Sequence, residues 1–167
     1  HITQRRLSMR FRAATAMFGH MGLELDLFEE SEEDLKVLEE AIELYKTHRD
    51  LLHGGEFLRL DAPDYMNTVG VVSEDRTQGL FSCAKLCSHQ STLPQRQRFK
   101  GLALSKSYRL NLLWPREEVS LTAPSIIEEA DLLGEGSVFS GEALVCHGLQ
   151  LPLMHPESCL IFYVQAE

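Results

Sequence analysis

The 167-residue sequence is short of several features, and each shortage excludes a class of protein. Lysine and arginine number 16 against 25 aspartates and glutamates, so the net charge of −9 repels a phosphate backbone. No apolar run approaches the roughly 20 residues that cross a bilayer, and the N-terminal stretch lacks the apolar core of a secretion signal. We therefore expect no nucleic-acid partner, no membrane partner and a cytoplasmic location.

Cysteine is also scarce. The four cysteines, Cys83, Cys87, Cys146 and Cys159, show no CxxC spacing and stand in apolar runs. This pattern predicts free, buried thiols in a reducing compartment rather than a disulfide framework. The sequence has no glycine-rich phosphate loop, metal-ligand cluster or nucleophile elbow, so it predicts neither a cofactor nor a metal site.

The first 55 residues predict a helix, a strand and a second helix. Apolar residues recur at helical spacing over 2–17. Residues 18–27 alternate with a period of two and predict a buried strand. Ser31 and the acids after it predict the start of a helix over 31–53, which glycines end at 54–55. The apolar stripe expected on this helix consists of Leu35, Leu38, Ile42, Tyr45 and Leu52.

From Glu56 onward the sequence predicts strands. Short runs rich in β-branched and aromatic residues are separated by Gly, Pro, Asp and Ser. The runs are 57–60, 69–73, 80–87, 108–114, 138–145 and 158–164. Their spacing is typical of an antiparallel β-sandwich over 56–167, separate from a first unit over 1–55. Residues expected in its core are Leu110, Leu112, Leu151, Ile161 and Phe162.

Two segments of the second unit have no strand pattern. We expect a long polar loop at 88–100 that leads into a strand, and an irregular segment at 117–136. Ile126 and Ile127 would anchor the second segment to the core.

Few residues are candidates for chemistry. His20 stands at the start of the predicted strand 18–27, whereas sites in parallel α/β layers lie at the other end, which favours a packed histidine over a catalytic one. Glu24 and Asp26 would point to the same side, as a carboxylate pair for glycoside chemistry would. The alternative, which we favour, is that Asp26 helps to cap the following helix and Glu24 meets an arginine.

For three further features we favour a structural role over a role in binding. His48 and His53 are five residues apart, the wrong offset for two metal ligands on one helical face. The arginines near the N-terminus could hold a phosphate or carboxylate, but they suit a solvated or interdomain face better. Trp114 could stack on a sugar, but it ends an alternating apolar face and is expected in the core.

Several longer motifs, in order, resemble glycoside hydrolase family 36, the microbial α-galactosidases. The run RAATAMFGHMGLELDL at 12–27 is similar to the last strand region of that family's catalytic barrel, and YKTHRDLLHGG at 45–55 to its final helix. The motifs at 71–76, 140–144, 148–153 and 156–158 resemble its C-terminal β-domain. The resemblance implies a mainly β fold, an antiparallel Greek-key β-sandwich preceded by a helix-strand-helix remnant of a (β/α)8 barrel.

The resemblance also implies what this chain lacks. Family members are retaining enzymes whose two catalytic aspartates lie in motifs with Lys-Trp-Asp and Cys-x-x-Gly-Gly, and neither motif occurs here. We therefore assign no catalytic residue to this chain, and its substrate-binding residues stay unknown. We expect the C-terminal fragment of a retaining enzyme that hydrolyses terminal α-D-galactosyl residues, with the α-galactoside bound by the missing barrel and a homo-oligomeric assembly.

Other functions stay open at this stage. A relative that acts on α-N-acetylgalactosaminides or transfers galactose would differ in residues upstream. A non-catalytic carbohydrate-binding sandwich would expose a planar set of aromatic residues, whereas this chain has one tryptophan and four tyrosines, mostly in alternating runs.

Overall fold

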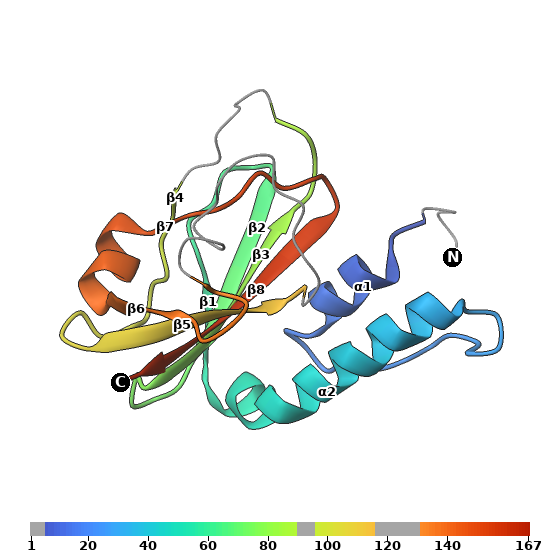
Figure 1. Ribbon diagram of the computed structural model, residues 1–167, viewed down its shortest axis with the longest axis horizontal. Coiled ribbons are helices and arrows are strands. Elements are labelled where there is room, and N and C mark those ends of the chain that lie inside the picture. The colour runs from blue at the N-terminus through green and yellow to red at the C-terminus, as the bar shows by residue number, and fades with distance from the viewer. Residues whose placement is uncertain (1–5, 90–95, 116–130) are drawn as a thin grey trace.

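The computed structural model describes residues 6–89, 96–115 and 131–167, and its helices and strands are labelled in Figure 1. The two α-helices are α1 (Met9–Ala16) and α2 (Glu32–Gly54), and a short π-helical turn forms η1 (Ala143–His147). The strands are β1 (Glu56–Arg59), β2 (Met66–Val72), β3 (Gln78–Lys85), β4 (Arg96–Gln97), β5 (Ser107–Trp114), β6 (Ser137–Ser140), β7 (Leu149–Gln150) and β8 (Ser158–Ala166).

A serine begins each α-helix. The Ser8 hydroxyl accepts a hydrogen bond from the Phe11 amide at 3.2 Å, and the Ser31 hydroxyl accepts one from the Asp34 amide at 3.1 Å. Three acidic residues in the first turn of α2 suit the positive end of its dipole. The predicted helix over 31–53 is confirmed. The first helix starts at Met9, later than predicted, and the start of the predicted range lies outside the described residues.

The strand predicted over 18–27 is wrong. The chain there is irregular, and no described strand pairs with it. Alternating residues form a strand only where a neighbouring strand takes up the backbone hydrogen bonds, and this segment has none. As a result, Leu23 and Leu27 are each 49% exposed and Phe28 is fully exposed.

In the described part of the chain, eight strands form two antiparallel sheets. The larger sheet has six strands in the order β1-β2-β3-β8-β5-β6, and the smaller pairs β4 with β7. Five of the six predicted runs match strands of the large sheet. The predicted antiparallel, mainly β fold is therefore confirmed.

The structure differs from prediction in two runs of the second unit. The run 138–145 is a strand only as far as Ser140, and the chain then turns into η1. The strand expected after the loop at 88–100 is the two-residue β4. Residues 90–95 and 116–130, including the predicted anchors Ile126 and Ile127, lie outside the described part of the chain.

The large sheet separates two buried cores. Helices α1 and α2 cover one face, and β4, β7 and η1 lie on the other side (Figure 1). The helix-side core comprises Met9, Phe11, Ala13, Ala14, Met17, Val37, Leu38, Ala41, Leu44, Leu80, Ala84, Trp114, Cys159 and Ile161. The opposite core includes Phe81, Cys83, Phe99, Tyr108, Leu110, Leu112, Leu144, Leu149, Leu151, Leu160 and Phe162.

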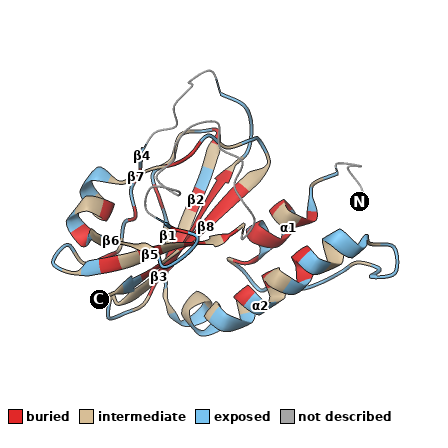
Figure 2. Ribbon diagram, viewed as in Figure 1, coloured by how far each residue is buried: buried red, intermediate tan, exposed pale blue. Residues whose placement is uncertain are grey.

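Burial follows these two cores along the sheet and along α2 (Figure 2). All five residues predicted for the sandwich core are buried, with Ile161 on the helix side and the other four on the opposite side. Strand β5 alternates regularly until a bulge between Leu112 and Trp114 turns Trp114 toward the helices.

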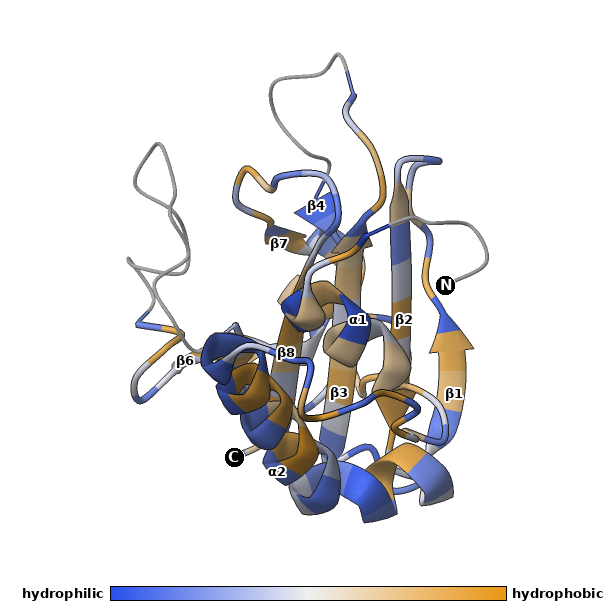
Figure 3. Ribbon diagram, turned by 90° about the vertical axis from the view of Figure 1, so that its right-hand side faces the viewer, coloured by the Kyte–Doolittle hydropathy of each residue, from blue (hydrophilic) through white to orange (hydrophobic). Residues whose placement is uncertain are grey.

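Hydrophobic and hydrophilic residues both recur along α2 (Figure 3), as expected of a helix with one packed face. Its fully buried residues are Val37, Leu38, Ala41 and Leu44. Of the predicted stripe only Leu38 is buried and the other four are half-buried, because the packed face of α2 centres on α1 and the sheet, with the segment 18–27 only at its margin. Neither α-helix in the described part of the chain is long and apolar enough to span a membrane.

The cysteine prediction is half right. All four thiols are free; Cys83 and Cys159 are buried, whereas Cys87 and Cys146 are exposed. Burial raises the pKa of the Cys83 thiol far above its usual range and that of Cys159 to about 12, so both are unreactive at neutral pH.

Candidate functional site

The two carboxylates considered for catalysis lie on the irregular segment after α1. Asp26 Oδ1 accepts a hydrogen bond from the Phe28 amide at 3.0 Å, which closes a local turn and does not cap α2. Glu24 is exposed, and no ion pair joins it to an arginine in the described part of the chain. The capping role predicted for Asp26 is therefore wrong, and the contact predicted between Glu24 and an arginine stays a prediction.

The same segment borders a hollow of about 240 Å³ against α1. It is lined by Arg12, Glu24 and otherwise mainly apolar residues of α1 and of 21–25. An acid/base pair for a glycosidic bond must stand on either side of a bound sugar. Two carboxylates on one exposed turn do not provide that arrangement.

His20 is exposed, and it contacts a second exposed histidine at the end of α2. Its ring stacks on His53, with 4.6 Å between the ring centres, and the Tyr45 hydroxyl lies 2.7 Å from His53 Nε2. This contact holds the segment after α1 against the end of α2.

His48 packs on the ring of Tyr163 of β8 at 4.8 Å. Burial lowers the pKa of His48. Across the described residues, no group of three or more potential ligands could hold a metal ion.

Trp114 is only 2% exposed and belongs to the helix-side core, so it cannot serve as a sugar platform. A cavity of about 230 Å³ lies beside it, between α1 and the start of β8. Its lining is mostly apolar, with Arg10, His155 and Glu157 among the polar exceptions. The cavity offers no pair of carboxylates. Of the described N-terminal arginines, Arg6 and Arg12 are exposed, whereas Arg10 is half-buried beside this cavity.

The turn between β2 and β3 is held by several side-chain hydrogen bonds. Asp75 Oδ1 accepts hydrogen bonds from the hydroxyls of Ser73 and Thr77, both at 2.7 Å, and from the Thr77 amide at 3.0 Å. These bonds lower the pKa of Asp75 to about 2. The buried Tyr108 donates its hydroxyl to the Arg76 carbonyl at 2.7 Å. These bonds stabilise the hairpin of β2 and β3, and the sequence pattern did not predict them.

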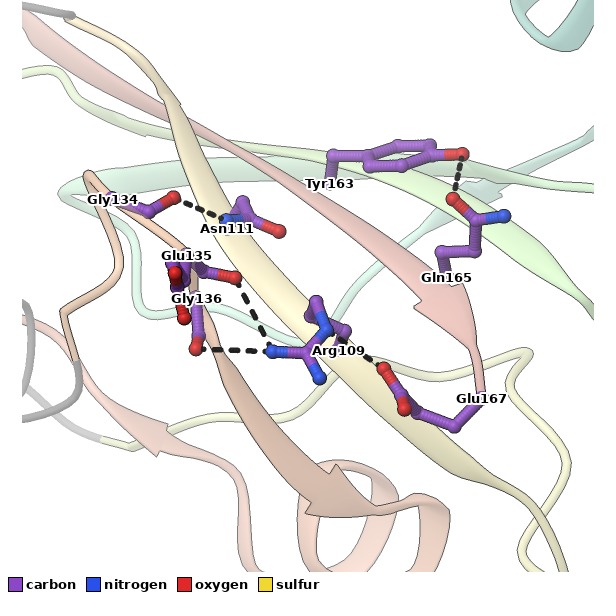
Figure 4. Close-up of polar contacts among 8 residues, drawn as sticks. All are labelled: Arg109, Asn111, Gly134, Glu135, Gly136, Tyr163, Gln165 and Glu167. Atoms are coloured by element: carbon purple, nitrogen blue, oxygen red, sulfur yellow. Dashed lines mark hydrogen bonds and ion pairs between the residues drawn. The ribbon is translucent and has the colours of Figure 1, made fainter.

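A second polar feature lies on the helix side of the sheet, at the margin of the part of β5 and β8 that the helices cover. Arg109 of β5 is opposite Gln165 of β8, and Asn111 is opposite Tyr163. Opposed residues of an antiparallel pair share one face, so these four side chains form an array (Figure 4). Gln165 is exposed and the other three are half-buried.

Main-chain carbonyls and one carboxylate hold this array. Arg109 Nε donates to Glu167 Oε1 at 2.7 Å, and its Nη1 donates to the carbonyls of residues 135 and 136 at 3.3 and 3.4 Å. Asn111 donates to the Gly134 carbonyl at 3.1 Å, and the Tyr163 hydroxyl donates to Gln165 Oε1 at 3.4 Å. The partners at 134–136 and 167 are far away in sequence, so no local pattern could predict the array.

Comparison with known proteins matches this chain to two family models. One, described as Melibiase, matches residues 1–55, and the other, described as Glycosyl hydrolase family 36 C-terminal domain, matches residues 66–164. Alpha-galactosidase of Escherichia coli is 37% identical over 169 residues, which cover 99% of this chain and 24% of that protein. The bifunctional alpha-galactosidase/sucrose kinase AgaSK of Mediterraneibacter gnavus is 29% identical over 91% of this chain and 14% of its own length.

Solved structures agree with the fold. The galactosidase domain of AgaSK superposes with a TM-score of 0.80 at 26% identity, over 100% of this chain and 21% of that one. The alpha-galactosidase AgaA variant A355E of Geobacillus stearothermophilus gives a TM-score of 0.79 at 23% identity, over 100% and 20%, and supports the fold alone. The chain spans about a quarter of the length of the Escherichia coli relative. Because the C-terminal domain model covers more than half of its residues, this chain belongs to glycosyl hydrolase family 36.

Proposed function

We propose that this chain is the C-terminal part of a longer α-galactosidase that removes terminal, non-reducing α-D-galactosyl residues from galactosides and oligosaccharides. One observation carries the proposal, namely the 37% identity with the Escherichia coli alpha-galactosidase over 99% of this chain. The order of the two matched family models along the chain supports it.

In this proposal the chain has a structural role and the catalytic groups come from the rest of the protein. Retaining hydrolysis needs two carboxyl groups about 5 to 5.5 Å apart, one as nucleophile and one as acid. The Asp26 carboxylate is engaged in its own turn, and Glu24 lies on the same exposed segment. Helices α1 and α2 share a core with the β-sheet, which suits a part that fixes a β-domain to a catalytic unit.

The experiment compares the purified chain with a chimera. In the chimera, this chain replaces the matching quarter of the Escherichia coli enzyme, and an enzyme truncated before that quarter is the control. We expect no turnover of an aryl α-galactoside by the chain alone and restored turnover by the chimera but not by the truncated enzyme. Turnover by the chain alone that is lost in Glu24→Gln or Asp26→Asn would overturn the proposal.

A further inference from the structure

The array on β5 and β8 is rigid for a surface feature. The Arg109 guanidinium is bonded to Glu167 and to two main-chain carbonyls, and the Asn111 amide is bonded to a third. Both residues stand on paired strands. Groups held in this way lose little conformational freedom when they bind a ligand.

The array keeps unused hydrogen-bonding atoms. In the described part of the chain, no hydrogen bond uses Nη2 of Arg109, Oδ1 of Asn111 or Nε2 of Gln165. These atoms supply two kinds of donor and an acceptor beside the half-buried ring of Tyr163 (Figure 4). Planar polar groups next to one aromatic ring match a ligand with adjacent hydroxyls and a C–H face.

The charge of the array favours an uncharged ligand. The ion pair between Arg109 and Glu167 offsets the one positive charge, and the other three side chains are neutral amides and a phenol. A phosphate or carboxylate ligand would be repelled by Glu167 as well as attracted by Arg109, so it would gain little binding free energy. Neutral hydroxyls bind both partners of such a pair without breaking it.

The composition of the array also argues against a protein contact. Buried protein interfaces centre on apolar and aromatic side chains with few charges. Among the described residues, no large exposed apolar side chain lies on β5 or β8; the nearest in register is Val138 of β6, opposite Arg109, and Leu23, Leu27 and Phe28 lie apart on the segment after α1.

We propose that Arg109, Asn111, Tyr163 and Gln165 form a saccharide-binding surface that takes uncharged oligosaccharides through adjacent hydroxyls. The side of the Tyr163 ring away from His48 packs against the C–H face of one sugar unit, while the amides and the guanidinium exchange hydrogen bonds with its hydroxyls. This surface is independent of the α-galactosidase activity, because binding needs no residue outside this chain.

The test uses the purified 167-residue chain and two saccharides. Galactomannan is cast into a native gel to measure retardation, and stachyose is titrated while amide NMR shifts are followed. The variants are Gln165→Ala and Tyr163→Leu, and the control is Asn67→Ala, which removes an exposed amide from β2 of the same sheet. Circular dichroism checks the fold of each variant.

We expect galactomannan to retard the parent chain and stachyose to shift amides of β5 and β8. Gln165→Ala should weaken binding about fivefold, the worth of one uncharged hydrogen bond, and Asn67→Ala should leave it unchanged. Should Tyr163→Leu fail to fold, the exposed Gln165 still carries the test. The proposal is overturned if neither saccharide binds, if the shifts map to other strands, or if Asn67→Ala weakens binding as much as Gln165→Ala.

Discussion

Ile161 is buried in the core that the helices and the sheet share. It is fully buried on the central strand β8, in the helix-side core, and lies opposite Trp114 of β5. Ile161→Ala should therefore destabilise the helices and the sheet together.

The magnitude follows from what alanine lacks. Three carbon groups of isoleucine are lost, and at about 0.8 kcal/mol for each buried group the transfer alone amounts to about 2.4 kcal/mol. The cavity adds to this because α1, α2 and the sheet can close only part of it, which gives a total of about 3 to 5 kcal/mol. For a chain of this size each kcal/mol lowers Tm by roughly 2 to 4 °C, so Tm should fall by roughly 6 to 20 °C.

Urea unfolding followed by two signals is the assay. Far-UV circular dichroism reports the helices, and the fluorescence of Trp114, the single tryptophan, reports the helix-side core. Leu112→Ala, on the opposite face of the sheet, should cost about the same. Val138→Ala is the control, because Val138 is 49% exposed and its loss should stay within about 0.5 kcal/mol.

Two results would refute the reasoning. An unfolding midpoint of Ile161→Ala within error of the parent would mean that Ile161 is not buried between the helices and the sheet. Separate midpoints for circular dichroism and fluorescence in the parent would mean that the helices and the sheet unfold independently, contrary to a shared core.

Three further predictions concern His48, Phe28 and Ser31. Burial lowers the pKa of His48, so the contribution of this histidine to stability should be complete above about pH 6.5 and be lost as the pH falls toward the lowered pKa. The difference in free energy of unfolding between the parent and His48→Phe, measured in urea from pH 5 to 8, isolates this contribution. Phe28 is fully exposed, so the chain should self-associate through this region, and Leu27→Ser with Phe28→Ser should lower the mass measured by light scattering; a monomeric parent at high concentration would contradict this. Ser31→Ala removes the bond to the Asp34 amide and should cost about 1 kcal/mol in urea unfolding, whereas Ser31→Asn, which can still cap the helix, should cost far less.

The sequence predicted the β-strands well because burial of one face of a strand makes apolar and polar residues alternate along it. In 108–114, alternate residues face the core, and the structure has the same alternation as far as the bulge. Ser31 likewise predicted the start of α2, because a helix cap acts over only three residues.

The wrong strand predictions share one cause: the residues that decide the local structure are distant in sequence. Residues 18–27 alternate like a strand, yet a strand forms only beside another strand. In 138–145 the residue types favour a strand, but the Gly141 amide donates to the Lys106 carbonyl at 2.7 Å and the chain turns there. A β-carbon on Gly141 would lie 2.0 Å from the Ala103 carbonyl, so only glycine fits this crossing.

The position of β8 governs the order in which this sheet can be built. The strand is last along the chain, yet it joins β3 on one side and β5 on the other. Until it arrives, β1-β2-β3 and β5-β6 are separate ribbons, each with an unpaired inner edge. Folding of the whole sheet must therefore wait for synthesis to reach β8, and its pairing with β3, whose partners lie from 73 (Lys85 and Ser158) to 87 positions apart (Gln78 and Gln165), should make the final step slow. A ribosome that stalls before β8 would leave two half-sheets with unpaired inner edges, which are prone to aggregate until β8 pairs with both.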